Sequence, residues 1–334
     1  MSTTTEGNFV ISGIDIRSAG RNGKGVFATR AIARGTLLID EAPLIVSPLE
    51  DKSIGWYSNL VNKFQSLPDD RKTQYLSLAA DQHILYAVNA IFRSASLRID
   101  EKSAAICAIF SVNNCRMDNE TCGVFPTYSR INHSCAPNTT WGYHESSGHI
   151  RVFAHKDIAA EEEITTSYVE ELCASRQDRH KHIHFTCECS VCTLPEDELR
   201  TSDAQRERTR GLETGVEVFI SREHRDIYTD IMGNVAPFPE EDLINAIKPS
   251  SLAEAVELVK EEIKLLGREH LTGQPLHINI KNLFWGARKD LSTSTLQYDG
   301  ALFDYCRLHQ DCYNVVSEWG RSDKFAEMGN VKSG

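Results

Sequence analysis

Two short stretches decide the fold: residues 132–138, with the sequence NHSCAPN, and residues 185–192, with the sequence FTCECSVC. The second stretch holds cysteines in the spacing C-x-C-x-x-C, so their thiolates can meet around one tetrahedral zinc ion. Cys135 in the first stretch is the natural fourth ligand. The predicted zinc ligands are Cys135, Cys187, Cys189 and Cys192. Four thiolates leave no open coordination position, so the zinc would be structural and not catalytic.

A competing interpretation makes these cysteines surface thiols in a loop, although such tight spacing is typical of metal and redox sites. The nearby histidines, His180, His182 and His184, alternate along the chain. Because the cysteines already supply a complete ligand set, we expect these histidines to form a polar face, or one of them to cap the cluster.

The other cysteines have a simpler interpretation. The chain has 10 cysteines, and in a reducing compartment thiols and metal ligands are commoner than disulfides. Several lie in apolar or helical stretches, where we predict small core side chains. They are Cys107, Cys173, Cys306 and Cys312.

Composition narrows the class of protein. The chain has 334 residues and 41% hydrophobic residues, enough for one large domain or two modest ones. Its net charge of -11 disfavours direct nucleic-acid binding and suits a basic partner such as a lysine-rich peptide. No apolar run is long enough to cross a bilayer, and the polar start is no secretory signal. We therefore expect a monomeric protein that does not bind a membrane and that is located in the cytoplasm or the nucleus.

Hydrophobic patterning predicts an α+β fold, a β-rich core of short strands with a helical insertion and a helical C-terminal tail. Strand patterns occupy residues 9–46 and 113–168, and a helical pattern occupies residues 51–110 between them. Residues 195–210 resemble a linker or an exposed helix. Residues 252–266 predict an amphipathic helix with Ser250 or Ser251 as its N-cap and Gly267 at its end, and residues 300–319 suggest another. The absence of strand–helix alternation disfavours a Rossmann fold.

Four stretches together resemble SET-domain protein-lysine methyltransferases. Residues 132–138 are similar to the family signature NHSCxPN, and residues 162–168, EEITTSY, to its GEEIT-x-SY segment. Upstream, residues 22–28 resemble a G-x-G-x-x-A turn, and residues 185–192 resemble the post-SET cysteine knuckle. The stretches follow the family order and span roughly residues 10–192. The insertion and tail are most similar to the SET-and-MYND branch and its fungal relatives, but the insertion has only Cys107 and no MYND finger.

The resemblance implies a domain layout and a core in which one chain segment is threaded beneath a loop. It places a SET domain at residues 9–172 with an insertion at about 51–110, a post-SET zinc segment at 173–194 and a helical C-terminal region at 195–334. In the core, one segment would pass beneath a loop formed by the preceding one, bringing Asn132 and His133 next to Tyr168. The tail could form a tetratricopeptide-like array, although no clean repeat is present.

The resemblance also implies an activity, methyl transfer from S-adenosylmethionine to a lysine of a protein substrate, histone or non-histone. Tyr168 would be the catalytic residue beside the reacting methyl group and amine. The implied cofactor-binding residues are Lys24, Gly25, Asn113, Asn132, His133, Tyr168 and Phe185, with Asn114 as the alternative to Asn113. The structural alternatives are a core tyrosine ending a strand, a capped turn at Asn132 and a core phenylalanine at Phe185.

Two departures from the family pattern affect these expectations. Glu161 stands where the family usually has glycine, so we expect the turn before Glu162 to be built differently. Phe125 stands where many relatives have tyrosine, which leaves the number of methyl groups transferred open. Two other functions compete: an inactive SET fold that binds a peptide, and a zinc-stabilised interaction protein. A zinc hydrolase is disfavoured because four thiolates leave no site for water.

Overall fold

The computed structural model describes residues 9–20, 23–49, 53–118, 120–144, 147–169, 171–183, 185–223 and 243–271. They fall into two compact units. The first unit holds the described residues up to Asn132 together with those of Trp141–Ile164, and the second holds His133–Thr140 and the described residues from Thr165 onward. Within the described ranges, no helix combines the length and the apolar character that a membrane span requires.

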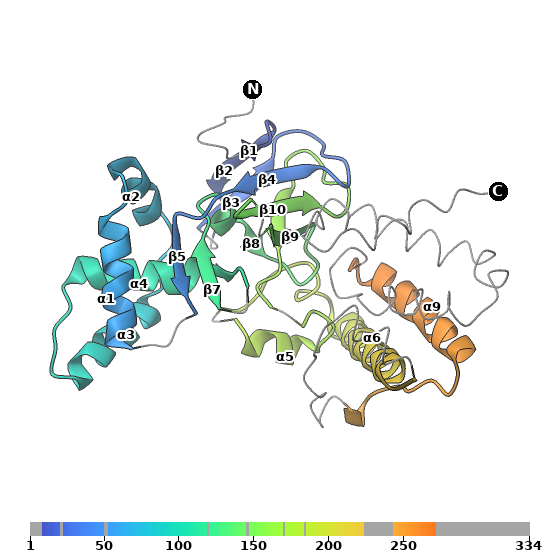
Figure 1. The fold of residues 1–334 in the computed structure, drawn as a ribbon. Helices are drawn as coiled ribbons and strands as arrows, with labels where there is room; N and C mark the ends of the chain where they lie inside the picture. Colours follow the sequence, from blue (N-terminus) through green and yellow to red (C-terminus); the bar gives the residue numbers. More distant parts are fainter. Residues whose placement is uncertain are drawn as a thin grey trace. The chain divides into compact units, whose positions relative to one another are not determined.

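The strands form three small sheets (Figure 1). One has the order β1-β4-β10-β9, made of Phe9–Val10, Leu37–Glu41, His149–Ala154 and Thr139–His144. Another has the order β2-β3-β11-β8, made of Ile14–Ser18, Lys24–Ala28, Glu163–Thr166 and Asn132–His133. The third has the order β5-β7-β6, made of Ile45–Pro48, Thr121–Val124 and Asn114–Arg116. The predicted α+β class is confirmed.

Alternating apolar residues explain the core of the β-rich part of the first unit. In β3, Val26 and Ala28 are fully buried, and β11 aligns Ile164 with Val26 in an antiparallel pair. β4 and β10 pair in the same way, with Ile39 opposite Val152. These side chains belong to one apolar cluster that also includes Phe125, so the short strands are held together by a shared core.

The predicted helical insertion is present in the first unit as α1 to α4: Ile54–Gln65, Asp69–Leu76, Gln82–Ser94 and Glu101–Asn113. Helical spacing puts Trp56, Leu60 and Phe64 on one buried face of α1. Side-chain caps define three helix starts, because Ser53, Asp81 and Asp100 each accept a hydrogen bond from a backbone N–H of the first turn. Cys107 is a buried core residue here, as predicted.

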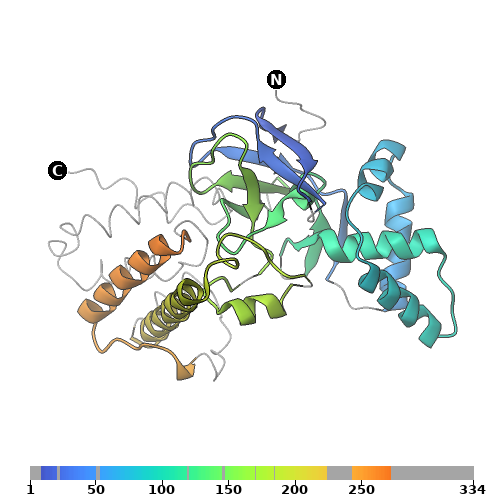
Figure 2. The same ribbon diagram turned by 180° about the vertical axis from the view of Figure 1, so that it is seen from behind.

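The second unit contains α5 (Arg176–Lys181), α6 (Glu196–Glu223) and α9 (Leu252–Arg268). Of the two predicted N-cap candidates, Ser251 is the N-cap of α9, and the helix runs one residue past Gly267 to Arg268. In Figures 1 and 2, α6 and α9 lie side by side. The apolar core of this unit includes Cys173, also as predicted, together with Leu266 and Leu271.

The expectation of a linker or exposed helix at residues 195–210 was wrong in one respect. The segment is helical, but one face of it is buried, with Leu199 and Ser202 at 5% exposure and Arg206 at 0%. Hydropathy alone predicts that a charged residue such as Arg206 is exposed. Its burial depends on partners elsewhere in the chain, so the pattern did not predict this buried face. The expected helix at residues 300–319, with Cys306 and Cys312, lies outside the described residues, as does His184.

The turn at Glu161 also differs from expectation. Glu161 has φ +68°, in the left-handed region that favours glycine, so the turn keeps a glycine-like backbone. Its carboxylate accepts a hydrogen bond of 2.6 Å from Arg17 Nη1, and both residues belong to the first unit. The side chain of Glu161 is 66% exposed, so it meets no obstacle from the core at this turn.

Candidate functional site

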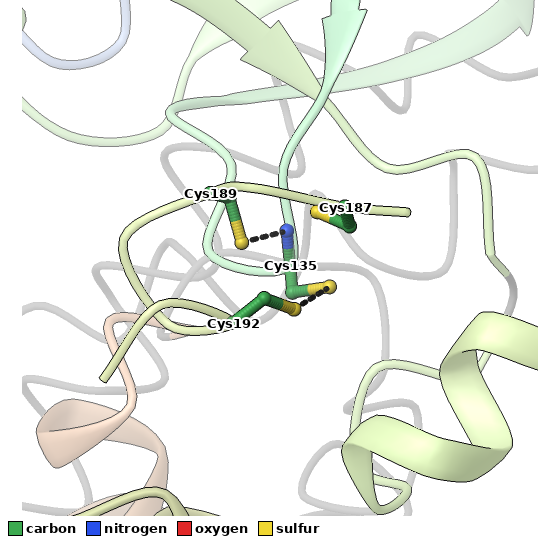
Figure 3. A group of neighbouring side chains, drawn as sticks. All are labelled: Cys135, Cys187, Cys189 and Cys192. Carbon is green, nitrogen blue, oxygen red and sulfur yellow. Dashed lines mark hydrogen bonds between the residues drawn. The ribbon is translucent and has the colours of Figure 1, made fainter. Parts of the chain in front are cut away.

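The predicted zinc ligands meet in the second unit (Figure 3). Cys135 lies in the loop after β8, and the others lie in the segment between α5 and α6. All four sulfur atoms lie within 4.8 Å of one another, and Cys135 Sγ and Cys192 Sγ are 3.6 Å apart. Sulfurs at the usual Zn–S distance of about 2.3 Å in a tetrahedron are about 3.8 Å apart, so this donor set fits a zinc ion.

The chemistry of the thiols is that of a shared cluster. Hydrogen bonding to Cys135, Cys189 and Cys192, followed by burial, raises the pKa of Cys187. Hydrogen bonding to Cys135, Cys187 and Cys192 lowers the pKa of Cys189, and the backbone N–H of Cys135 lies 3.4 Å from the Cys189 sulfur. One thiolate is thus already favoured by its neighbours, and a metal cation would favour the others.

His133 connects this cluster to Tyr168 within the second unit. The backbone N–H of Tyr168 donates to His133 Nδ1 at 3.0 Å, so the other ring nitrogen, Nε2, carries the proton. Nε2 lies 3.3 Å from Cys135 Sγ and donates toward it. Burial lowers the pKa of His133 to about 4, so the imidazole is neutral at neutral pH. One buried ring therefore joins a sulfur of the cluster to the backbone of Tyr168.

Two exposed aromatic rings surround this histidine. The side chains of Tyr168 and Phe185 are 50% and 45% exposed, and their ring centroids are 6.4 Å apart in an edge-to-face arrangement. His133 lies 5.5 Å from the Tyr168 ring and 6.1 Å from the Phe185 ring. This exposure is unlike the core tyrosine and core phenylalanine of the structural alternatives. Exposed aromatic side chains beside a buried polar group are typical of a binding site.

Of the alternating histidines that the structure describes, His180 and His182, the first contacts the cluster. His180 Nε2 lies 3.5 Å from Cys192 Sγ, whereas His182 is exposed. His180 therefore caps the cluster, which is one of the two roles expected for these histidines.

In the first unit, Lys24, Gly25 and Asn132 lie together. The side-chain amide of Asn132 donates to Lys24 O at 3.2 Å and to Glu163 Oε1 at 2.7 Å. A Cβ on Gly25 would lie 2.4 Å from Glu163 Oε1 and 2.9 Å from Asn132 Nδ2, so glycine is needed here for close approach. Glu163 was not among the predicted site residues. Its place in the EEITTSY segment was the only signal for it.

Comparison with known proteins gives this arrangement its context. Residues 23–169 match the family model described as the SET domain. The chain contains a SET domain. Its strands β3 to β11, the helical insertion and the sequence up to Val169 fall within the matched residues.

Curated relatives share the domain over part of their length. Histone-lysine N-methyltransferase set5 of Schizosaccharomyces pombe is 29% identical over 56% of this chain and 52% of its own length. Histone-lysine N-methyltransferase SMYD3 of Mus musculus is 28% identical over 47% of this chain and 39% of its own. N-lysine methyltransferase SMYD2-B of Danio rerio is 28% identical over 39% and 30%. The match thus spans about half or less of the length of these relatives.

The asparagines that end the helical insertion of the SET domain bond to nearby carbonyl groups. Asn113 Nδ2 donates to the carbonyl oxygens of Ala79 and Ile109, both at 2.7 Å. Asn114 Nδ2 donates to Phe110 O at 3.0 Å and Ser111 O at 3.2 Å. These bonds explain how each side chain is held; a cofactor contact by Asn113 stays a prediction.

A buried carboxylate in the first unit orders the segment that precedes the NHSC motif. The carboxylate of Glu41, 2% exposed, accepts hydrogen bonds from the backbone N–H groups of Thr127 and Tyr128 at 3.0–3.2 Å. Burial raises the pKa of Glu41, and these hydrogen bonds partly offset it. Phe125, the position that departs from tyrosine, is fully buried beside Tyr143. Sequence reasoning missed Glu41, because its partners lie 86 residues further on.

Arg206 of α6 is a second residue that the sequence analysis missed. Its Nη1 donates to the carbonyl oxygens of Cys135 at 3.0 Å and Leu172 at 2.7 Å, and its Nε donates to Glu269 Oε2 at 2.7 Å. All these residues belong to the second unit. The guanidinium thus connects the C-terminal helices to the loop that carries Cys135 and to the segment after Tyr168.

Proposed function

We propose that this protein transfers the methyl group of S-adenosylmethionine to a lysine side chain of a protein substrate, histone or non-histone. The observation that carries the proposal is the half-exposed Tyr168, whose backbone is held by the buried His133 beside a four-cysteine cluster, inside a SET domain. The relatives named above are lysine methyltransferases, which supports the same activity.

The residues of the chain would divide the work of binding as follows. In the first unit, Lys24, Gly25 and Asn132 would contact the cofactor, as would Asn113. The Asn132 amide nitrogen is engaged by Lys24 and Glu163, which leaves its oxygen as an acceptor for the adenine amine. The proposed cofactor contacts in the second unit are His133, Tyr168 and Phe185. S-adenosylmethionine supplies an electrophilic methyl group on a positively charged sulfur.

The target lysine must be neutral to accept a methyl group. A free lysine has a pKa near ~10.4, so only about one in a thousand is neutral at pH 7. A site that excludes water and holds a positive charge lowers that pKa. The Tyr168 hydroxyl would orient the amine for in-line attack, and alignment of this kind can account for about 100-fold in rate. The neutral His133 adds no competing charge.

We further propose that the cysteine cluster binds one structural zinc ion through Cys135, Cys187, Cys189 and Cys192. The fit of four sulfurs within 4.8 Å of one another supports this. We also retain the layout of a SET domain at 9–172, a post-SET segment at 173–194 and a helical region from 195 onward as a proposal.

The test is transfer of labelled methyl from S-adenosylmethionine into proteins of a native extract, by the wild type and by Tyr168→Phe. We expect label on lysines of discrete proteins with the wild type and about 100-fold less with the variant. Tyr86→Phe is the matched control, because Tyr86 is an exposed tyrosine of α3, at 68% exposure. Zinc binding without S-adenosylmethionine binding would instead favour a non-catalytic interaction module.

A further inference from the structure

Glu163 of β11 lies beside two of the proposed cofactor contacts, Gly25 and Asn132, but has no role in the function proposed above. All three residues belong to the first unit. In its sheet, β11 lies between β3 and β8, and Glu163 aligns with Phe27 of β3. From this place Glu163 Oε1 accepts a hydrogen bond of 2.7 Å from Asn132 Nδ2. The carboxylate therefore contacts a side chain that would bind S-adenosylmethionine.

The acceptors around Asn132 determine which way its amide faces. An amide side chain has a donor nitrogen and an acceptor oxygen of nearly the same size, so its hydrogen-bond partners set its orientation. The carbonyl oxygen of Lys24, 3.2 Å from Asn132 Nδ2, can only accept, and so can the ionised carboxylate of Glu163. Both groups therefore require the nitrogen of Asn132 on their side, and the amide oxygen is directed away from them.

Gly25 gives the carboxylate and the amide room against the backbone of β3. A Cβ at this position would lie 2.4 Å from Glu163 Oε1 and 2.9 Å from Asn132 Nδ2, so a side chain would push the two groups apart. Of the two acceptors, the carboxylate makes the shorter hydrogen bond, and an ionised acceptor binds about twice as strongly as a neutral one. Glu163 is therefore the main constraint on the amide.

We propose that Glu163 is a positioning residue of the cofactor site: it holds the Asn132 amide so that the amide oxygen accepts a hydrogen bond from an amine of S-adenosylmethionine. This rests on the proposed function and extends it, because a residue outside the set of cofactor contacts then controls how well one of them binds. The cofactor has one amine on its adenine and one at its amino-acid end, and an oxygen acceptor fits either. Without Glu163 the amide can rotate, and its nitrogen would then face another donor.

The experiment measures the dissociation constant of S-adenosylhomocysteine, the demethylated cofactor, with the full chain by calorimetry. Glu163→Met keeps the length of the side chain and removes the acceptor, and it is made both in the wild type and in the Asn132→Ala background. We expect the dissociation constant to rise about 10-fold in the wild-type background and less than about twofold in the Asn132→Ala background. Glu161→Gln is the matched control, because Glu161 precedes the same strand, is exposed and pairs with Arg17. We expect less than about a twofold change in this control.

Two analogues distinguish the amines of the cofactor. S-inosylhomocysteine has a carbonyl in place of the adenine amine, and a second analogue of S-adenosylhomocysteine lacks the α-amino group. Glu163→Met should weaken binding by less than about twofold for the analogue without the contacted amine, and by about 10-fold for the other. A merely structural role of Glu163 would instead raise the dissociation constants of all these ligands by the same factor.

The outcomes separate this proposal from the one on which it rests. A wild type that binds no S-adenosylhomocysteine overturns the proposed function itself. A wild type that binds it, with Glu163→Met of equal affinity, overturns only the role of Glu163, as does a loss that is equal for all ligands or undiminished in the Asn132→Ala background. If Glu163→Met does not fold, Glu163→Gln decides: a selective loss of about threefold supports the proposal, because a neutral acceptor holds the amide less strongly, and no loss contradicts it.

Discussion

Replacement of Arg206 by methionine removes the link between the C-terminal helices and the cysteine loop while keeping most of the side-chain volume. Arg206 is 0% exposed and donates to four oxygens, which are the carbonyls of Cys135 and Leu172, the carboxylate of Glu269 and, at 3.4 Å, the hydroxyl of Ser202. Hydrogen bonds to charged groups contribute about 1.5–3 kcal/mol each, and removal of one partner of a buried ion pair costs about 3–5 kcal/mol. Since these contributions overlap, we expect Arg206→Met to lower the free energy of unfolding by about 4 kcal/mol.

The assay is urea unfolding of the full chain, followed by the midpoint and slope of the transition. The matched control is Arg200→Met on the same helix, because Arg200 is 68% exposed and pairs with Asp197 at the surface. We expect the control to change stability by less than about 0.5 kcal/mol, as exposed ion pairs contribute little. The contrast isolates the buried contacts from the loss of one positive charge.

A second substitution tests the cause of the loss. Glu269→Gln in the Arg206→Met background removes the carboxylate left unpaired, and glutamine can still accept the hydrogen bond that Ser202 Oγ donates at 2.6 Å. We therefore expect the double variant to be more stable than Arg206→Met alone. A cost below about 1 kcal/mol for Arg206→Met, or fully additive effects of the two changes, would refute the reasoning.

Two further predictions concern Glu262 of α9 and the contact of α6 with Ile247, which precedes α9. Burial raises the pKa of Glu262 from 4.5 to about 8, so the folded state holds a proton that the unfolded state releases, and the free energy of unfolding should fall as pH rises through that range. Glu262→Gln should therefore make the melting temperature less dependent on pH between pH 5 and 8. An unchanged pH dependence in the variant would contradict this. A Cβ on Gly215 would lie 2.0 Å from Ile247 O, so Gly215→Ala should cost about 2 kcal/mol in thermal unfolding. Gly55→Ala, whose Cβ would meet nothing closer than 3.8 Å, should leave stability unchanged or raise it.

The parts of the fold that follow local rules could be predicted from the sequence. Trp56, Leu60 and Phe64 repeat with the period of a helix, and all three are buried on α1. The cysteine set was also predictable, because thiolates that share a metal must converge wherever they lie in the chain. In both cases a periodicity or a chemical requirement restricts the solutions to very few.

The parts of the fold that depend on distant polar partners could not be predicted from the sequence. Arg206 and Glu269 are 63 residues apart, and a charged residue in a polar segment indicates exposure until its partner is known. The buried Arg179 is hidden for the same reason, because its partner Asp203 comes from another segment. Glu161, in its glycine-like turn, pairs with Arg17, which is 144 residues away in sequence. In each of these pairs, the sequence around one residue contains no pattern that predicts its distant partner.

The separation of the cysteines along the chain has a consequence for biosynthesis. Cys192 leaves the ribosome 57 residues after Cys135, which takes roughly 3–11 s at about 5–20 residues per second. Arg206, which holds the carbonyl of Cys135, comes 71 residues after it, and Glu269 a further 63 residues later. Cys135 is therefore synthesised well before Cys189, Cys192 and Arg206, which contact it in the folded chain. With the proposed zinc site, metal capture would close this part of the molecule late, after most of the SET domain has already emerged.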